Sequence, residues 1–406
     1  MLATLVPLFD ENMAVSAYSL FAQKSNYLLN PRFLGTGSND GATNIAGLEI
    51  IESMGIETLS NDKEVFVEVN NISVFADISS LCSAPHDRIV LLADQSITPD
   101  AMYVARFKEL KKMGYRIAIR KLTDEKIEEY HELLLLMEFI LLDHKKHDMD
   151  KTKQYFSSAY PDMKLCAVNV DSKEEFDELK ASGGYTLYEG DFFRLPVTKG
   201  EEEVTPLKVN YINLLNMVND SDFELTKAAD VIGRDTALVI SLLKMVNRMA
   251  VNSEITSIRH AAAMLGQKEL RKWINTAVTN ELCADKPNEV TRISLLRAKF
   301  AENLAPTFGM EVHSSELFLM GLFSVIDLIL GKPMKEALEM VKLSKSINEA
   351  LVDNKGEFAP VLDFIIHYER ASWQEVSRQM LLLKIDIDSV YDAYIKSLKW
   401  YRDLFE

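Results

Sequence analysis

The first half of the chain alternates between short apolar runs and longer amphipathic stretches. The apolar runs are rich in β-branched residues and fall at 65–69, 88–92, 116–119, 139–142 and 164–168. The amphipathic stretches, at 99–114, 123–137 and 172–184, begin at or just after Thr98, Thr123 and Ser172, residue types that cap helices. Strands alternating with helices at this spacing predict a parallel sheet. We therefore expect an α/β domain, a (β/α) barrel of the TIM type.

The pattern changes near residue 197. Residues 198–206 (TKGEEEVTP) are polar, hold three consecutive glutamates and end in proline, which is typical of a linker. Beyond them, apolar positions recur at helical spacing at 221–233, 235–250, 256–266 and 267–282, and onward to the C-terminus. We expect a barrel domain over 1–198, a linker at 199–205 and an all-α bundle over 206–406. A first domain of this size is near the lower end of about 200 to over 400 residues for such barrels, so a reduced or irregular barrel is expected.

Charge and composition narrow the classes of partner. The formal net charge is −16, and neither half is basic, which counts against nucleic acid or an anionic membrane as the main partner. The three cysteines are scattered, as expected in a reducing compartment. The longest apolar stretches, Leu133–Leu142 and Leu317–Leu330, each contain an acidic residue and fall short of the ~20 residues of a membrane span. The N-terminal residues carry no basic cluster of the secretory kind, so we expect a cytoplasmic protein.

The second half resembles an HDOD domain. The resemblance lies in LLNMVNDSDFELTKAADVIGRDTALVISLLKMVNR (214–248), ITSIRHAAAMLGQKELRKW (255–273) and LFLMGLFSVIDLILGKPMKEAL (317–338). HDOD domains are similar to metal-dependent HD hydrolases that have lost the metal residues. At the position of the His-Asp pair of those hydrolases, this chain has Ser324 and Val325. The resemblance therefore implies a helical module without a metal site.

The first half is similar to an EAL domain, the barrel that hydrolyses cyclic di-GMP in bacteria. The similar segments are LVPLFDENMAVSAYSLFAQ (5–23), IVLLADQSITPD (89–100), KKMGYRIAIRKL (111–122), KLCAVNVDSKEEFDELKASG (164–183) and YTLYEGDFFRLP (185–196). An EAL domain followed by an HDOD domain is a known bacterial arrangement. Together the two resemblances cover nearly the whole chain.

The resemblance also shows what the chain lacks. The EAL family uses acidic residues at the carboxyl ends of barrel strands to hold two divalent metals. The positions of its metal, catalytic and phosphate residues correspond here to Ser19, Gln23, Leu92, Gln95, Arg120, Lys121, Leu141, Val168 and Glu189. A further asparagine ligand corresponds either to Glu68 or to Asn70. We therefore expect no metal, no cofactor and no catalytic residue in this barrel.

Two other clusters have competing interpretations. His144 and His147 lie three residues apart and could share a metal on a helix, but an exposed loop after a strand is the preferred interpretation because Lys145 and Lys146 would repel a cation. The basic residues from 108 to 121 could form an anion-binding patch. A solvated helix face beside a repurposed barrel mouth is preferred, and Arg120 with Lys121 could hold an acidic partner side chain.

These observations lead to an expected function. The chain is expected to be a catalytically inactive regulatory protein, not an enzyme, that binds a protein partner through the helical half as a signalling scaffold, and it could be a homodimer. Two alternatives stay open. One is an active cyclic di-GMP phosphodiesterase, and the other is a sensor that binds cyclic di-GMP or another nucleotide without hydrolysing it.

Overall fold

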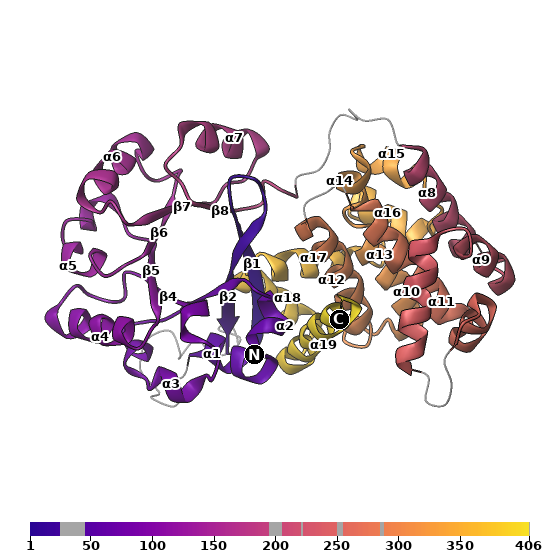
Figure 1. Ribbon diagram of the computed structural model, residues 1–406, viewed down its shortest axis with the longest axis horizontal. Coiled ribbons are helices and arrows are strands. Elements are labelled where there is room, and N and C mark those ends of the chain that lie inside the picture. The colour runs from indigo at the N-terminus through magenta and orange to yellow at the C-terminus, as the bar shows by residue number, and fades with distance from the viewer. Residues whose placement is uncertain (25–44, 195–204, 221, 250–254, 285–287, 406) are drawn as a thin grey trace. The chain divides into compact units, whose positions relative to one another are not determined.

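The computed structural model describes residues 1–24, 45–194, 205–220, 222–249, 255–284 and 288–405. Its first part is a closed barrel whose strands follow chain order, β1 to β8 (Figure 1). The strands are β1 Leu2–Phe9, β2 Val15–Gln23, β3 Glu64–Glu68, β4 Ile89–Ala93, β5 Arg116–Arg120, β6 Phe139–Asp143, β7 Lys164–Val168 and β8 Leu187–Glu189. The five apolar runs that predict strands are all confirmed as strands.

The barrel is regular except at its first strand. Strand β1 pairs antiparallel with both β2 and β8, and the strands from β2 to β8 pair in parallel. All eight strands are present, against the expectation of a reduced barrel. The small size of this region comes instead from short strands, since β3 to β7 have 5 residues each and β8 has 3.

Helices cover the outside of the parallel strands. They are α1 Ala46–Met54, α2 Ile56–Ser60, α3 Ile78–Leu81, α4 Ala101–Lys112, α5 His131–Leu134, α6 Met149–Ala159 and α7 Lys173–Ser182. Helices α4 and α7 confirm two of the predicted amphipathic stretches. The third, 123–137, is shorter than predicted: it forms a 3-10 turn at Asp124–Lys126 and the single turn α5. These turns already bury Tyr130, Leu133 and Leu134 against the barrel, so packing does not require one long helix.

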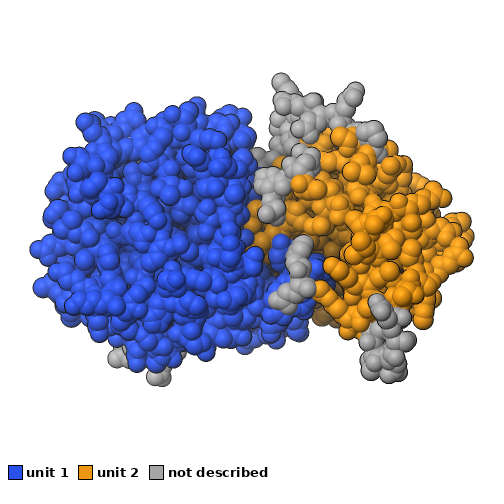
Figure 2. Space-filling model, in the orientation of Figure 1, with its two compact units in different colours: residues 1–195, 364–406 blue, residues 196–363 orange. Residues whose placement is uncertain are grey.

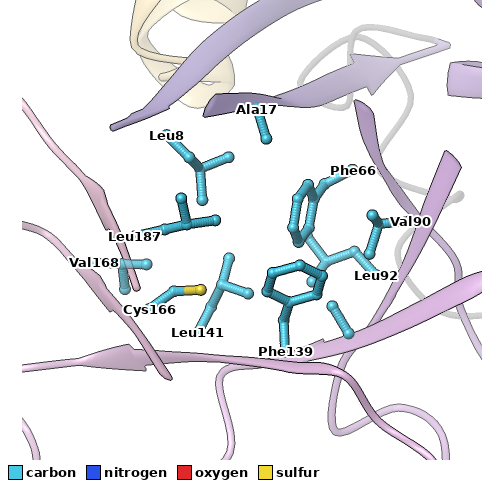
Figure 3. Packing of buried hydrophobic residues seen from close by; sticks show 11 residues of the cluster. Leu8, Ala17, Phe66, Val90, Leu92, Phe139, Leu141, Cys166, Val168 and Leu187 are labelled. Carbon is cyan, nitrogen blue, oxygen red and sulfur yellow. The ribbon is translucent and has the colours of Figure 1, made fainter. Parts of the chain in front are cut away.

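Apolar side chains fill the barrel. Because side chains alternate along a strand, every second residue points inward. The inward residues form one buried cluster: Leu8, Ala17, Phe66, Val90, Leu92, Ala118, Phe139, Leu141, Cys166, Val168 and Leu187 (Figure 3). At roughly 25 cal/mol per Å² of apolar surface removed from water, this packing is a main source of the stability of the barrel. Polar chemistry is left to the layer above it, at the carboxyl ends of the strands.

The C-terminal helices belong to the same compact unit as the barrel. After α17 (Ala359–Glu369), helices α18 (Trp373–Leu383) and α19 (Ile387–Phe405) complete this unit. The buried Tyr368 hydroxyl accepts a hydrogen bond from the Ala3 backbone N–H at 3.1 Å. The Gln23 side chain contacts Ser377 at 3.4 Å. Strands β1 and β2 thus contact segments more than 350 residues away in the sequence.

The division into units differs from the predicted domain boundaries. Residues 1–195 and 364–406 form one compact unit, and residues 196–363 form the other (Figure 2). The predicted helical domain, 206–406, therefore runs past the end of the second unit. The predicted linker, 199–205, lies outside the described residues except for Thr205. The second unit is inserted into the chain of the first.

The second unit is helical throughout its described residues. Its helices are α8 Pro206–Asn219, α9 Leu225–Ile232, α10 Thr236–Met249, α11 Ile258–Leu282, α12 Asn288–Leu304, α13 Ser314–Phe323, α14 Ile326–Leu330, α15 Met334–Glu339 and α16 Lys345–Asp353. Within α11 the backbone of Gly266 has φ +75°, in the left-handed region that glycine adopts readily. This break separates the two predicted segments 256–266 and 267–282.

Candidate functional site

The floor of the barrel mouth is apolar. Leu92, Leu141 and Val168, on β4, β6 and β7, stand at positions where the EAL resemblance implies metal or catalytic residues. Their side chains point into the barrel (Figure 3) and are 1%, 1% and 6% exposed. None carries an atom that could coordinate a metal or accept a hydrogen bond. The structure therefore brings these three sequence-predicted positions together as core.

Above this floor lies a small network of charged groups. The Arg120 guanidinium, at the end of β5, lies between two carboxylates: its Nη2 is 3.5 Å from Oε1 of Glu189, and its Nη1 is 3.8 Å from Oε1 of Glu68. The hydroxyl of Ser19 donates to the other oxygen of Glu189 at 3.1 Å. The guanidinium also lies 4.9 Å from the centre of the Phe21 ring. Ser19, Arg120 and Glu189, assigned separately from the sequence, are thus one connected cluster.

The network decides between two alignments of the sequence. Glu68 pairs in register with Leu92 and faces Arg120, so it belongs to the mouth. Asn70 instead uses its side-chain oxygen to accept hydrogen bonds from the backbone N–H groups of Ile72 and Ser73, each at 2.9 Å. Such a turn engages the amide locally. Glu68 is therefore the residue of the two that takes part in the site.

Arg120 is incompletely satisfied. Its side chain is 12% exposed, and its Nε and Nη1 groups have no hydrogen-bond acceptor among the protein atoms. Leaving a buried donor unpaired costs about 1–3 kcal/mol, and more for a charged group. Although 42% of the Glu68 side chain is exposed, the protein packed around its carboxyl group raises the pKa of Glu68, and the positive charges of Arg120 and Lys121 oppose this only in part.

A cavity of about 640 Å³ opens beside Arg120. Its size is within the range of roughly 300–1,000 Å³ for small-molecule sites. Loops at the carboxyl ends of β5, β6 and β7 line it, and these loops hold Lys121 and Asn169, whose backbones have φ of +59° and +61°. The Gln95 amide donates to the carbonyl of Lys121, which holds that strained residue in place. Such backbone strain in non-glycine residues is concentrated at functional sites.

The rim of the cavity carries paired charges. Burial opposes ionisation of Asp143, but hydrogen bonds from Lys146, from the Lys145 backbone and from Asn169 together lower the pKa of Asp143. The Lys146 ammonium lies 2.9 Å from Asp143, and the Asn169 amide donates to the same oxygen at 2.8 Å. Lys121 is exposed at the rim. The cavity thus combines an apolar floor with charged groups of both signs.

The two histidines after β6 have separate partners. Nδ1 of His144 lies 2.9 Å from the Val168 carbonyl, and its Nε2 lies 3.5 Å from Glu175. Nδ1 of His147 is hydrogen-bonded to Asp124, which follows β5. Asp124 and His147 line the cavity, whereas His144 lines a different and smaller one. The sequence analysis did not predict the Asp124–His147 pair. The signal that could have indicated it is that Asp124 closely follows β5 and His147 closely follows β6, which are neighbouring parallel strands.

The predicted basic run does not form one surface. Lys108, Lys111 and Lys112 are exposed on α4, Arg116 begins β5 and Arg120 ends it. Of the residues in this basic run, only Arg120 and Lys121 therefore lie at the barrel mouth.

The residues present do not fit the two divalent cations that the EAL resemblance implies. Leu92, Leu141 and Val168 offer no ligand atoms. A fixed positive charge about 4 Å from a dication costs roughly 8 kcal/mol at an effective dielectric near 20, and Arg120 places such a charge in the mouth. Within the ranges that the structure describes, no three His, Cys, Asp or Glu side chains are grouped to hold a metal.

The corresponding positions in the helical unit serve packing. The Ser324 hydroxyl donates to the Gly321 carbonyl at 2.7 Å and accepts from Nη1 of Arg297 at 3.1 Å. Val325 is 3% exposed. A Cβ at Gly321 would lie 2.4 Å from the backbone oxygen of Arg297, so glycine allows α12 and α13 to approach closely. Ser324 and Val325 therefore stabilise this helix pair.

Comparisons with known proteins agree with the two-part fold. Residues 205–355 match the HDOD domain model. The "Cyclic di-GMP phosphodiesterase CdgJ" of Vibrio cholerae serotype O1 is 26% identical over 325 residues, which cover 79% of this chain and 74% of that protein. The "Uncharacterized protein YuxH" of Bacillus subtilis is 26% identical over 411 residues, covering 98% of each chain. A standalone EAL protein of Vibrio cholerae O395, solved with c-di-GMP bound, is similar to 47% of this chain and 90% of its own, with 14% identity and a TM-score of 0.35.

The chain therefore combines an eight-stranded barrel with a helical region that matches the HDOD domain model. The predicted resemblance and the predicted fold class are confirmed, with the barrel closed by eight strands and an HDOD match on the helical region. Among the described helices, none is long and apolar enough to cross a membrane.

One expectation is corrected by these comparisons. The sequence led us to expect a protein that is not an enzyme, but the relative matched over 79% of the chain is named a phosphodiesterase. The expectation equated the loss of one set of metal ligands with the loss of activity. Guanidinium groups and other fixed donors can also stabilise the charge of a phosphodiester, so the missing carboxylates do not settle the class of protein.

Proposed function

We propose that the chain acts on cyclic di-GMP, which enters the barrel mouth and has a phosphodiester bond opened there. The observation that supports this most is the similarity to a protein named a cyclic di-GMP phosphodiesterase. The 325 matched residues are more than either compact unit contains, so the similarity spans both units. A match confined to the helical unit would say nothing about the barrel.

The location of the cavity supports the proposal. In barrels of this type, active sites lie at the carboxyl ends of the strands, in the loops that follow them. The cavity of about 640 Å³ lies at that end, beside β5, β6 and β7. Arg120 supplies a fixed positive charge in the wall of the cavity, which suits an anionic phosphodiester. No step is assigned to a divalent metal, because the residues present do not fit one.

The test uses the purified full-length chain. Titration calorimetry with cyclic di-GMP, with GMP as the control ligand, measures binding, and chromatography of the reaction mixture measures the linear dinucleotide. We expect binding of cyclic di-GMP and formation of the linear product. Arg120→Gln should weaken binding at least tenfold, because it removes the largely buried positive charge in the wall of the cavity. If neither binding nor product is detected, this function is wrong.

We also propose that the helical unit binds a protein partner. Several large apolar side chains stand exposed on its first helices: Leu207 at 60%, Ile240 at 50%, Met249 at 50% and Met264 at 45%. Exposed apolar side chains of this kind are common in interaction surfaces. The double variant Ile240→Lys/Met264→Lys should lose cross-linked partners in the source organism. Met102→Lys, a change at an equally exposed methionine of the barrel unit, is the matched control. Equal cross-linking by both variants would place the interaction elsewhere.

A further inference from the structure

The cavity in the barrel mouth contains a cation and a candidate base that belong to one site. Arg120 lies in its wall; its Nε and Nη1 are buried and have no hydrogen-bond acceptor among the described residues, and Nη2 is the nitrogen left to face a ligand. The guanidinium is a permanent cation whose N–H groups donate to phosphate oxygens. Phe21 lies beside the guanidinium. Glu189 accepts a hydrogen bond from Ser19 and forms an ion pair with Nη2 of Arg120, which orients the guanidinium. The Nη2 side of Arg120 is therefore the part of the guanidinium that an anionic ligand in the cavity can reach.

The candidate base is His147. Its side chain is 5% exposed, and its Nδ1 is hydrogen-bonded to the carboxylate of Asp124. With the Nδ1 proton donated to Asp124, the lone pair of a neutral imidazole is on Nε2. A carboxylate that orients a histidine in this way is a recurring arrangement for general-base catalysis. Asp124 and His147 come from the loops after β5 and β6, the same two strands that frame the cavity beside Arg120.

We propose that this site opens the phosphodiester without a divalent metal: Arg120 binds the phosphodiester, and His147, positioned by Asp124, accepts the proton of the attacking water. The inference rests on the proposed function, from which the substrate is taken. The water oxygen forms a bond to phosphorus, and the bond from phosphorus to the 3′ oxygen breaks. The water proton passes to Nε2 of His147, and the 3′ oxygen is protonated from solvent. The products are one 5′-phosphate and one 3′-hydroxyl on a linear dinucleotide, and no oxidant or reductant is needed.

The floor of the cavity favours this mechanism over a metal-dependent one. Leu141 and Val168, which also line the cavity, cannot hold a cation or its waters. A charge that develops on the phosphoryl oxygens during attack must then be stabilised by fixed donors, and Arg120 is a buried one. Asp124 has no direct contact with the substrate in this scheme, so it is a positioning residue.

The experiment measures linear product formed from cyclic di-GMP by the full-length chain, with a chelator or with added Mg²⁺ or Mn²⁺. The inference expects equal rates in all three conditions. His147→Gln should lower kcat by roughly 10²–10⁴-fold with little change in KM. Asp124→Asn should also lower kcat at constant KM, since it disturbs only the orientation and tautomer of the histidine. Arg120→Gln should mainly raise KM.

His144→Gln is the matched control. His144 lies three residues before His147 in the same loop but does not line this cavity; it contacts the Val168 backbone carbonyl and Glu175, so its replacement should leave kcat and KM unchanged. Circular dichroism and thermal melting of each variant verify that it is folded. The chelator experiment on the wild-type chain needs no variant, so it tests the inference even if a variant does not fold.

The possible failures are distinguishable. Product that forms only with Mg²⁺ or Mn²⁺ overturns this inference and leaves the proposed function intact. The same holds for product that forms with a chelator but is unaffected by His147→Gln. If the wild-type chain yields no product under any condition, the proposed function itself fails.

Discussion

The two ends of strand β5 each carry an arginine, and the environments of these arginines differ. At the start of the strand, Arg116 donates through Nε to Glu138 at 2.7 Å and is also paired with Glu64. The Lys164 ammonium joins the same Glu138 carboxylate at 2.9 Å. At the end of the strand, Arg120 is flanked by two carboxylates at 3.5 and 3.8 Å, and two of its nitrogens have no acceptor.

Both arginines lie beside an aromatic ring, at 5.0 Å from Phe139 for Arg116 and 4.9 Å from Phe21 for Arg120. Both arginines thus contact an aromatic ring in the same way, and they differ in how completely their N–H groups are hydrogen-bonded. At the start of the strands, the ion pairs and hydrogen bonds of Arg116 stabilise the barrel. At the carboxyl ends, Arg120 has longer ion pairs and lines the cavity, so it is suited to receive a ligand. The same division between a stabilising face and a functional face is general in barrels of this type.

The largest expected effect is on the folding of the barrel unit, which depends on the C-terminal helices. A chain of residues 1–198 lacks Tyr368, α18 and α19, which contact β1 and β2, so we expect it to be insoluble or unfolded. Residues 1–195 joined to 364–406 by a flexible linker should fold, since Arg194 lies 3.3 Å from Glu369 and the two segments meet there. Far-ultraviolet circular dichroism and thermal melting of both chains test this. A cooperatively folded 1–198 would show that the C-terminal helices are dispensable.

Replacing either arginine tests the comparison itself. Arg116→Met leaves Glu64 and Glu138 without their shared partner and should lower the free energy of unfolding by roughly 2 kcal/mol. Arg120→Met should lower it by less than half as much, because fewer hydrogen bonds are lost. Denaturant titration measures both. An equal or larger loss for Arg120→Met would contradict the division into a stabilising end and a ligand-binding end.

The ion cluster at the start of the strands predicts a pH dependence. The hydrogen bond from Arg116 lowers the pKa of Glu138 to about 2, and the contact with Lys164 adds to this against the opposing effect of burial. The folded pKa is below the ordinary value of 4.5, so this stabilisation is full above that pH and is lost as the pH falls toward about 2. Glu138→Gln should cost about 1–2 kcal/mol at pH 7 and progressively less below pH 4.5. Unfolding titrations of both proteins from pH 7 to pH 3 measure the gap, and a gap that stays constant over this range would refute the assignment.

The smallest expected effect is on the affinity of the barrel mouth for its ligand. Glu189→Gln keeps a hydrogen-bonding side chain beside Ser19 but removes the negative charge opposite Arg120. We expect the affinity for cyclic di-GMP to rise about threefold to tenfold, or roughly 1 kcal/mol. Glu64→Gln, at the other end of the barrel, is the control and should not change the affinity. A weaker affinity in Glu189→Gln would mean that Glu189 itself contacts the ligand or positions Arg120 for it.

Several features of the site could not be predicted from local sequence. Asp124 and His147 are 23 residues apart, and only the pairing of β5 with β6 brings them together. The sequence also does not reveal that Glu189 pairs with Arg120. Glu189 lies on β8, and it approaches Arg120 on β5 only because the barrel closes. Contacts between residues distant in sequence depend on register and closure, which no short pattern encodes.

The C-terminal helices show the same limit for domain boundaries. Their apolar spacing matches that of the preceding helices, so it predicts helices but not the body on which they pack. One signal was present: β1 is apolar at nearly every position, LATLVPLF, and a strand buried on both faces needs a cover outside the barrel. Nothing in the sequence identifies Tyr368, which accepts a hydrogen bond from Ala3 of β1, as part of that cover.

The sequence by itself determined the strand and helix segments, the two-part organisation and the apolar floor of the mouth. These follow from side-chain periodicity and from the residue types at single positions, which are local properties of the chain. Only the tertiary structure decided that α17 and α19 contact β1, that Arg120 lies between Glu68 and Glu189, and that His147 meets Asp124. Each of these is a contact between distant segments, and its free energy depends on distances and burial that exist only after the barrel has closed.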